Sequence, residues 1–182
     1  MKRLLMTVLV LVGSAAMAKE VVGVKMPDTL SVEGKDLKLN GMGVRVKIVF
    51  KVYVAGLYLE STSNDPAKIL AADQTRRVDM HMLRDLEKAK IVEAIKTGFE
   101  KNSKDAMPKL QERLEKFVAV IPDLKEGQVL SLSYVPGKGT TVNGPNKETF
   151  TAEGKDFADA LFSVWLGQNP VDSGLKDGML GK

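Results

Sequence analysis

Few side chains in this chain are able to do chemistry. The sequence has one histidine, His81, and no cysteine. Thiol nucleophiles and thiolate metal sites are therefore excluded, and a serine–histidine triad or a zinc site would depend on His81 alone. His81 could act as a lone base, but no second histidine or clear orienting partner accompanies it. We therefore interpret it as a structural or surface residue, and we expect no catalytic residue, no metal site and no cofactor.

Arg45 is the side chain best suited to recognise an anion. It follows Gly41 and Gly43 and stands near the start of a strongly apolar strand pattern. Its planar guanidinium could hold a carboxylate through two parallel hydrogen bonds. The common alternative is an arginine on the solvent face of a strand. Tyr53 and Tyr58 could each present a hydroxyl to a ligand or serve as core aromatics.

The elements that must position these residues follow a pattern typical of one α+β domain, with strands mainly early and helices mainly late. The alternation of apolar residues is strongest over residues 44–59, which predicts a single long strand there. Other strands are predicted at residues 21–26, 29–32, 37–39, 76–83 and 129–135, with a hairpin over 140–150. Helices are predicted at residues 66–71, 85–102, from 105 to before Pro122, 154–166 and 172–180, with Asp65, Asp85 and Asp105 at the first three starts. No repeat or linker interrupts residues 19–182.

The first eighteen residues predict a secretory signal peptide. Lys2 and Arg3 precede an apolar run over residues 4–12, and small residues follow up to Ala18 in an A-x-A pattern. We expect cleavage after Ala18. The apolar run is about half the length needed to span a bilayer, so we expect no integral membrane anchor in the mature protein. A signal this short is typical of bacteria, which predicts a periplasmic protein.

The overall charge gives little support for a nucleic-acid partner. The net charge is +4, and it falls to about +2 once Lys2 and Arg3 are removed. No segment interleaves aromatic with basic residues as nucleic-acid binders do. We therefore expect no nucleic-acid partner.

One segment resembles a known family. The run Lys51-Val-Tyr-Val-Ala-Gly-Leu-Tyr-Leu-Glu60 is similar to the signature strand of the chalcone isomerase family, and Gly41-Met-Gly-Val-Arg45 precedes it as in that family. The resemblance continues through residues 114–117, 127–139 and 155–167. It implies an open-faced β-sandwich, in which a large antiparallel sheet is covered by a layer of helices with a ligand cleft between them.

The resemblance also implies which residues line that cleft. In chalcone isomerases an arginine orients the substrate phenolate, while a threonine, a tyrosine, an asparagine and a second threonine position the substrate and a water. The arginine corresponds to Arg45, but the other four places fall at or near Tyr53, Lys90, Thr97 and Ala158, so most of the catalytic set is missing. Fatty-acid-binding relatives use an arginine and a tyrosine for the ligand carboxylate, which Arg45 and Tyr53 match. We expect Arg45, Tyr53, Lys90 and Thr97 to be ligand-binding residues.

The pairing of Arg45 with Tyr53 imposes a geometric condition. Eight residues of unbroken strand separate Cα atoms by about 26 Å, too far for one carboxylate to meet both side chains. The chain would have to bend sharply between Val46 and Lys51, where no glycine or proline stands. A β-bulge could supply such a bend.

Three functional hypotheses follow. The first is a non-catalytic periplasmic protein that binds a small apolar carboxylic acid such as a fatty acid. The second is an intramolecular lyase or isomerase acting on an enone. The third is a structural or interaction module whose cleft is filled by its own side chains. The fold alone does not decide among these hypotheses, because fold does not determine function. The sequence does not give the oligomeric state.

Overall fold

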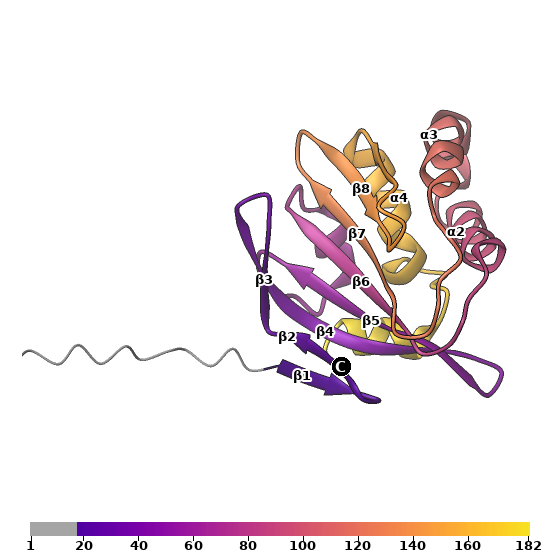
Figure 1. Cartoon of the computed structure of the whole chain (residues 1–182). Coiled ribbons are helices and arrows are strands. Elements are labelled where there is room, and N and C mark those ends of the chain that lie inside the picture. Colours follow the sequence, from indigo (N-terminus) through magenta and orange to yellow (C-terminus); the bar gives the residue numbers. More distant parts are fainter. Residues whose placement is uncertain (1–17) are drawn as a thin grey trace, which may run out of the picture.

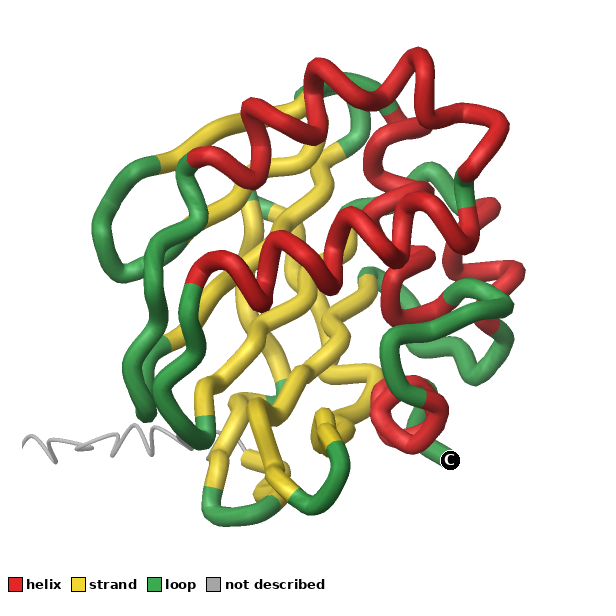
Figure 2. The backbone as a smooth tube through the Cα atoms, turned by 90° about the vertical axis from the view of Figure 1, so that its right-hand side faces the viewer, coloured by secondary structure: helices red, strands yellow, loops and turns green. Residues whose placement is uncertain are grey.

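The protein is built on one curled antiparallel sheet with helices packed on one of its faces (Figure 1). The computed structural model describes residues 18–182. The predicted signal peptide therefore lies outside the described residues, apart from Ala18, which begins β1. Figure 2, viewed from the helical side, shows the helices crossing in front of the strands. The predicted α+β architecture, an antiparallel sheet covered by helices, is confirmed.

The sheet has seven strands in the order β3-β4-β5-β6-β7-β8-β9, so each strand pairs with its neighbour along the chain. Two further strands, β1 and β2, form a separate ribbon that covers the opposite face near β4 and β5 (Figure 1). The strands are β1 (Ala18–Val21), β2 (Val24–Pro27), β3 (Thr29–Val32), β4 (Lys35–Lys47), β5 (Phe50–Leu59), β6 (Arg76–Met82), β7 (Val129–Val135), β8 (Gly139–Asn143) and β9 (Thr149–Ala152).

The helices bury apolar stripes against the sheet. The helices are α1 (Pro66–Ala71), α2 (Lys88–Asn102), η1 (Lys104–Ala106), α3 (Met107–Ala119), α4 (Lys155–Leu166) and α5 (Ser173–Met179). The helices predicted at α2 and α3 are confirmed with later starts, and their residues Ile91, Ile95, Leu110 and Leu114 are buried in one core with α4. No helix within residues 18–182 combines the length and apolar character needed to cross a bilayer.

The prediction of one strand over residues 44–59 was wrong. The chain turns back at residues 47–50, and β4 and β5 form an antiparallel hairpin. The turn contains none of the residues that usually mark one, and Ile48 adopts a φ of 61°, which β-branched residues rarely do. The sharp bend that shared binding by Arg45 and Tyr53 requires is therefore present, and it is a complete reversal of the chain.

The predicted break between strands at residues 37–39 and 44–59 was also wrong, because β4 continues through residues 40–43. Its glycines have a packing role instead. A Cβ atom at Gly43 would lie 2.3 Å from the backbone oxygen of Leu175, so only glycine lets α5 approach β4 this closely. The predicted strand over residues 21–26 is divided by a turn at Val22 and Gly23.

Two predicted helix caps were wrong as well. The helix α2 begins at Lys88, whose N–H donates to the Asp123 carboxylate at 2.7 Å, while Asp85 is held by Lys125. A 3-10 turn precedes α3, so Asp105 does not cap that helix. The predicted cap of α1 is confirmed, since the Asp65 side chain accepts from the backbone of Ala67 and Lys68.

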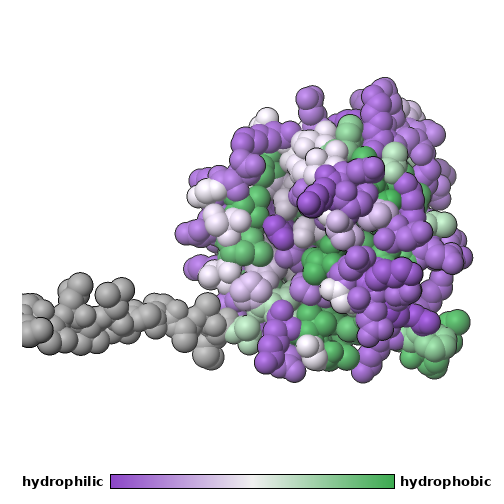
Figure 3. All heavy atoms as spheres, in the orientation of Figure 1, coloured by the Kyte–Doolittle hydropathy of each residue, from purple (hydrophilic) through white to green (hydrophobic). Residues whose placement is uncertain are grey.

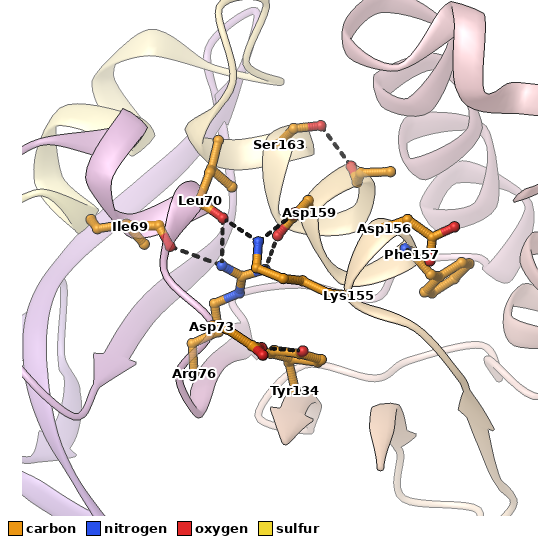
Figure 4. A network of polar contacts seen from close by, with 11 residues as sticks. Ile69, Leu70, Asp73, Arg76, Tyr134, Lys155, Asp156, Phe157, Asp159 and Ser163 are labelled. Carbon is orange, nitrogen blue, oxygen red and sulfur yellow. Dashed lines mark hydrogen bonds and ion pairs between the residues drawn. The ribbon is translucent and has the colours of Figure 1, made fainter. Parts of the chain in front are cut away.

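A buried arginine joins α1, β6 and α4 (Figure 4). The Arg76 side chain is fully buried, and its Nη2 donates to the Asp159 carboxylate at 2.6 Å. Its Nη1 donates to the carbonyl oxygen of Ile69 at 2.8 Å. The guanidinium lies over the rings of Tyr134, at 5.1 Å, and Phe162, at 4.7 Å. The Arg76 side chain is fully buried and these contacts are all with groups of the protein itself, so we assign this network a structural role.

Replacing Arg76 with alanine should destabilise the fold strongly. The substitution removes the partner of a carboxylate and leaves a void between two aromatic rings. We expect the free energy of unfolding to fall by about 3–5 kcal/mol, measured by urea denaturation. The control is Lys96→Ala, which breaks an exposed ion pair with Glu115 and should lower it by about 1 kcal/mol or less. Equal effects of the two substitutions would contradict the structural role of Arg76.

Candidate ligand-binding site

Arg45 and Tyr53 lie directly opposite each other in the β4–β5 hairpin. Side chains of opposite residues project from the same face, with Cβ atoms about 4.5–5.5 Å apart. Tyr53 is buried in the core beneath the helices, which identifies this face as the one facing α2 and α4. The pairing register shifts between Arg45 and Val46, where Val52 is the extra residue of a bulge. One small anion can therefore reach both side chains.

A cavity of about 80 Å³ opens beside this pair. Its walls come mainly from β5, α2 and α4 and are largely apolar. The lining residues are Arg45, Lys47, Val52, Tyr53, Met80, Leu86, Lys90, Ile91, Ala94, Ile95, Val164, Trp165 and Val171. We call this space the inner cavity.

A second hollow of about 210 Å³ lies next to it, between α2 and the segment that precedes α5. We call it the outer cleft. Arg45, Lys47 and Lys90 line both spaces, whereas Thr97 lines the outer cleft. The four residues predicted from the sequence are therefore brought to two adjoining spaces, with Tyr53 in the inner one.

Arg45 is held in place by a carboxylate of the protein itself. Its Nη1 donates to the carboxylate of Asp172 at 3.1 Å and to the carbonyl oxygen of Val46 at 2.6 Å. Within residues 18–182, its Nε and Nη2 donate no hydrogen bond. One edge of the guanidinium is thus neutralised internally, and the remaining donors are available to a second acceptor.

Asp172 also fixes the start of α5. One of its oxygens accepts from the backbone N–H of Leu175 at 2.9 Å, which caps the helix, and the other accepts from the N–H of Val46 at 3.1 Å. Burial alone would raise the pKa of Asp172. The hydrogen bonds from Leu175, Val46 and Arg45 outweigh it and hold that pKa below its usual range. Asp172 is therefore ionised near neutral pH and competes with any ligand anion for Arg45.

Tyr53 is oriented by Trp165. The indole N–H of Trp165 donates to the Tyr53 hydroxyl oxygen at 3.1 Å, and the hydroxyl donates to no residue within 18–182. Burial is the main cause that raises the pKa of Tyr53 to about 12. The hydroxyl therefore keeps its proton near neutral pH, and it can donate a hydrogen bond to a ligand but cannot act as a base.

The mouth of the two spaces is positively charged. Lys47 and Lys90 line both spaces beside Arg45, and Lys101 lines the outer cleft. Glu93 also lines the outer cleft and lies 4.0 Å from the Lys90 ammonium, so it compensates part of this charge. The excess of basic groups favours an anion at the entrance.

Three other residues considered from the sequence lie elsewhere. His81 pairs with Val54, whose side chain belongs to the small core on the opposite face of the sheet. The pKa of His81 is lowered by burial, and the side chain does not line the cavity. Tyr58 lies on that same opposite face and donates to the carbonyl oxygen of Pro27 at 3.0 Å. Ala158 is buried in α4 and lines neither space.

Two residues at the site were not predicted from the sequence. Lys47 lies two residues beyond Arg45 on the same strand, so strand alternation could have identified it. Asp172 is distant in sequence, and only the packing of α5 on β4 brings it to Arg45. Among the described residues, no cluster of three histidine, aspartate or glutamate side chains is arranged to hold a metal ion.

Replacing Tyr53 with phenylalanine tests the hydrogen bond between the Trp165 indole N–H and the Tyr53 hydroxyl. The buried indole N–H loses its acceptor, so we expect a loss of about 1–2 kcal/mol in the free energy of unfolding and a shifted Trp165 emission. The pKa of Tyr53 in the folded protein, about 12, lies above the ordinary value of 10. The protonated hydroxyl therefore contributes fully to the free energy of unfolding below pH 10, and this contribution is lost as the pH rises from 10 to 12. Urea denaturation across this range should show a smaller alkaline loss in Tyr53→Phe than in the wild type.

The control is Tyr58→Phe, which removes a hydroxyl from the other face of the sheet. It should leave Trp165 emission unchanged, since Tyr58 hydrogen-bonds to Pro27 instead. Identical emission spectra for Tyr53→Phe and the wild type would contradict the assigned contact.

Comparisons with known proteins agree with this architecture. The sequence model of a family described as "Chalcone isomerase-like" matches residues 18–181. The crystal structure of a fatty-acid binding protein from Arabidopsis thaliana superposes with a TM-score of 0.69 and 12% sequence identity, covering 90% of this chain and 96% of that one. At this identity the likeness shows the fold alone. The chain has no significant match among curated protein sequences.

Proposed function

Because the chain belongs to the chalcone isomerase-like family, we propose that it is a non-catalytic protein that binds a small apolar carboxylic acid such as a fatty acid. One observation carries the proposal: Arg45 and Tyr53 stand side by side at an apolar cavity, and each retains unused hydrogen-bond donors. A carboxylate would bind Arg45 through Nε and Nη2 and accept the Tyr53 hydroxyl proton, while the apolar part of the ligand lies against Ile91 and Val164.

The size of the inner cavity limits what it can hold. At about 80 Å³ it is smaller than the usual range of about 300–1,000 Å³ for small-molecule pockets. An acid with a few carbon atoms would fit without rearrangement. A longer chain would have to extend into the outer cleft or move α2 away from β5. Affinity should therefore depend on chain length as well as on the carboxylate.

The alternatives have less support. Isomerase chemistry would need polar groups that position the substrate and a water, yet the corresponding places fall at or near Lys90, Thr97 and Ala158. The protonated Tyr53 hydroxyl supplies no base. A purely structural module would have its cleft filled, whereas the space beside Arg45 is open. The Arabidopsis thaliana protein that shares this fold is a fatty-acid binding protein, which agrees in kind with the proposed ligand.

We place this activity in the periplasm, on the basis of the predicted signal peptide. The test is the intact mass of the protein released from the periplasm by osmotic shock. The expected mass corresponds to a chain that begins at Lys19. A chain that stays in the cytoplasm with residues 1–18 attached would contradict the proposed location.

Replacing Arg45 with alanine should weaken the binding of a fatty acid about ten- to a hundredfold, because a charge-assisted contact to the carboxylate is lost. Replacing Asp172 with asparagine should tighten binding several-fold, because the competing charge is removed, although α5 loses part of its cap. Trp165 lines the cavity, so its fluorescence reports the titration directly. A chain-length series from short to long acids gives the size preference.

The matched control is Arg113→Ala, which removes an arginine paired with Asp156 and distant from the cavity. It should bind as the wild type does. If Arg45→Ala binds fatty acids as tightly as the wild type, the proposed function is wrong. If Arg45→Ala and Asp172→Asn weaken binding equally, the ion pair has a structural role only.

A further inference from the structure

The turn of the β4–β5 hairpin carries an exposed apolar surface. We call residues 46–51 the hairpin tip. Ile48 is 87% exposed, Val49 77% and Phe50 54%, and Val46 is also exposed. Within residues 18–182, only one other large apolar side chain, Val22, is exposed to a comparable degree. Figure 3 shows the apolar tip projecting at the lower right of the molecule, where Figure 1 places the turn after β4. Such a concentration on one projection indicates an interaction surface.

The backbone of the tip indicates that its apolar side chains are not there for folding. Ile48 has a φ of 61°, a conformation that glycine or asparagine adopts at much lower cost. Its side chain contributes almost nothing to the core, since it is nearly fully exposed. An isoleucine at this position is unfavourable in the free protein, both for the backbone and for the solvated side chain. Burial in a partner would offset the second of these costs.

Basic side chains surround the apolar tip. Lys47 and Lys51 lie on either side of Ile48, Val49 and Phe50 within the tip, and the Arg84 guanidinium lies 4.8 Å from the centre of the Phe50 ring. The nearby carboxylate of Asp85 is engaged by Lys125, with a 2.8 Å hydrogen bond, and Glu87 is the other acidic residue close by. An apolar projection with a basic rim complements the surface of an anionic bilayer, where acyl chains lie beneath phosphate groups.

The tip adjoins the proposed ligand site. A hollow of about 340 Å³ lies between the tip and the start of α2. Ile48 and Phe50 line its outer part, and Val52, Leu86 and Lys90 line both this hollow and the inner cavity. The hollow and the inner cavity therefore adjoin, with Val52 and Leu86 as common apolar lining.

We propose that the hairpin tip docks the protein on the surface of an anionic lipid bilayer. Ile48, Val49 and Phe50 enter below the headgroups, while Lys47, Lys51 and Arg84 contact the phosphates. The mouth of the ligand site then faces the lipid, where an acyl chain can pass to or from the cavity. The docking itself does not depend on the proposed ligand, so each can fail while the other holds.

Vesicle binding and a depth probe test the docking. The Val49→Trp variant is mixed with vesicles of phosphatidylcholine, with or without phosphatidylglycerol, and its emission and quenching by brominated lipids are recorded against the Trp165 background. We expect a blue shift and quenching, both stronger with phosphatidylglycerol. This probe reports the tip directly, whether or not the N-terminal apolar run is still attached.

Substitutions in the tip give the second measurement. The double variant Ile48→Asn, Val49→Ser should lower the vesicle partition coefficient at least about tenfold without lowering the melting temperature, since asparagine suits the φ of Ile48. Its matched control is Val22→Asn, at another exposed turn residue with a φ of 51°, which should leave partitioning unchanged. Lys51→Glu should weaken binding to anionic vesicles, whereas Lys109→Glu on α3 should not.

Three results would overturn the proposal. The first is an unchanged emission of Val49→Trp on addition of anionic vesicles. The second is equal partitioning of the wild type and the double tip variant. The third is a concentration-dependent dimer, formed without lipid and lost in the double tip variant, because it would assign the tip to a second copy of the chain.

Discussion

The antiparallel pairing of β4 with β5 is the constraint on which the other features depend. It places Arg45 opposite Tyr53, so that two residues eight positions apart serve one space. It forces the chain to reverse at residues 47–50, which exposes the apolar tip beside that space. It also leaves the glycines of β4 open to α5, so the helix packs against backbone and brings Asp172 to Arg45. The ligand site, the hairpin tip and the packing of α5 on β4 therefore all follow from the register of one hairpin.

The ion pair between Arg45 and Asp172 decides how the site can work. A half-buried arginine without a partner would be unfavourable, and Asp172 supplies one while capping α5. The same carboxylate reduces the attraction that Arg45 exerts on a ligand anion, and Lys47 and Lys90 at the mouth offset part of that loss. In the proposed function the ligand therefore uses the donors of Arg45 that Asp172 leaves free, and no catalytic base is needed.

The sequence predicted the elements in which apolar residues recur at a short, regular spacing. The helices α2 and α3 and the Asp65 cap depend on residues a few positions apart, and they were found. The hairpin turn was missed because Ile48 and Val49 favour strands and no glycine or proline marks the reversal. The partner of Arg45 was missed because it lies 127 positions away and is brought near by tertiary packing. Resemblance to a family supplied the candidate site residues, whereas their geometry required the structure.

The most direct measurement is a crystal structure of the protein with a bound fatty acid. The account predicts that a carboxylate oxygen of the ligand lies within hydrogen-bond distance of Nε or Nη2 of Arg45 and of the Tyr53 hydroxyl. It also predicts that the acyl chain enters the inner cavity and that Asp172 still caps α5. A ligand whose carboxylate lies away from Arg45, with the inner cavity empty, would contradict it.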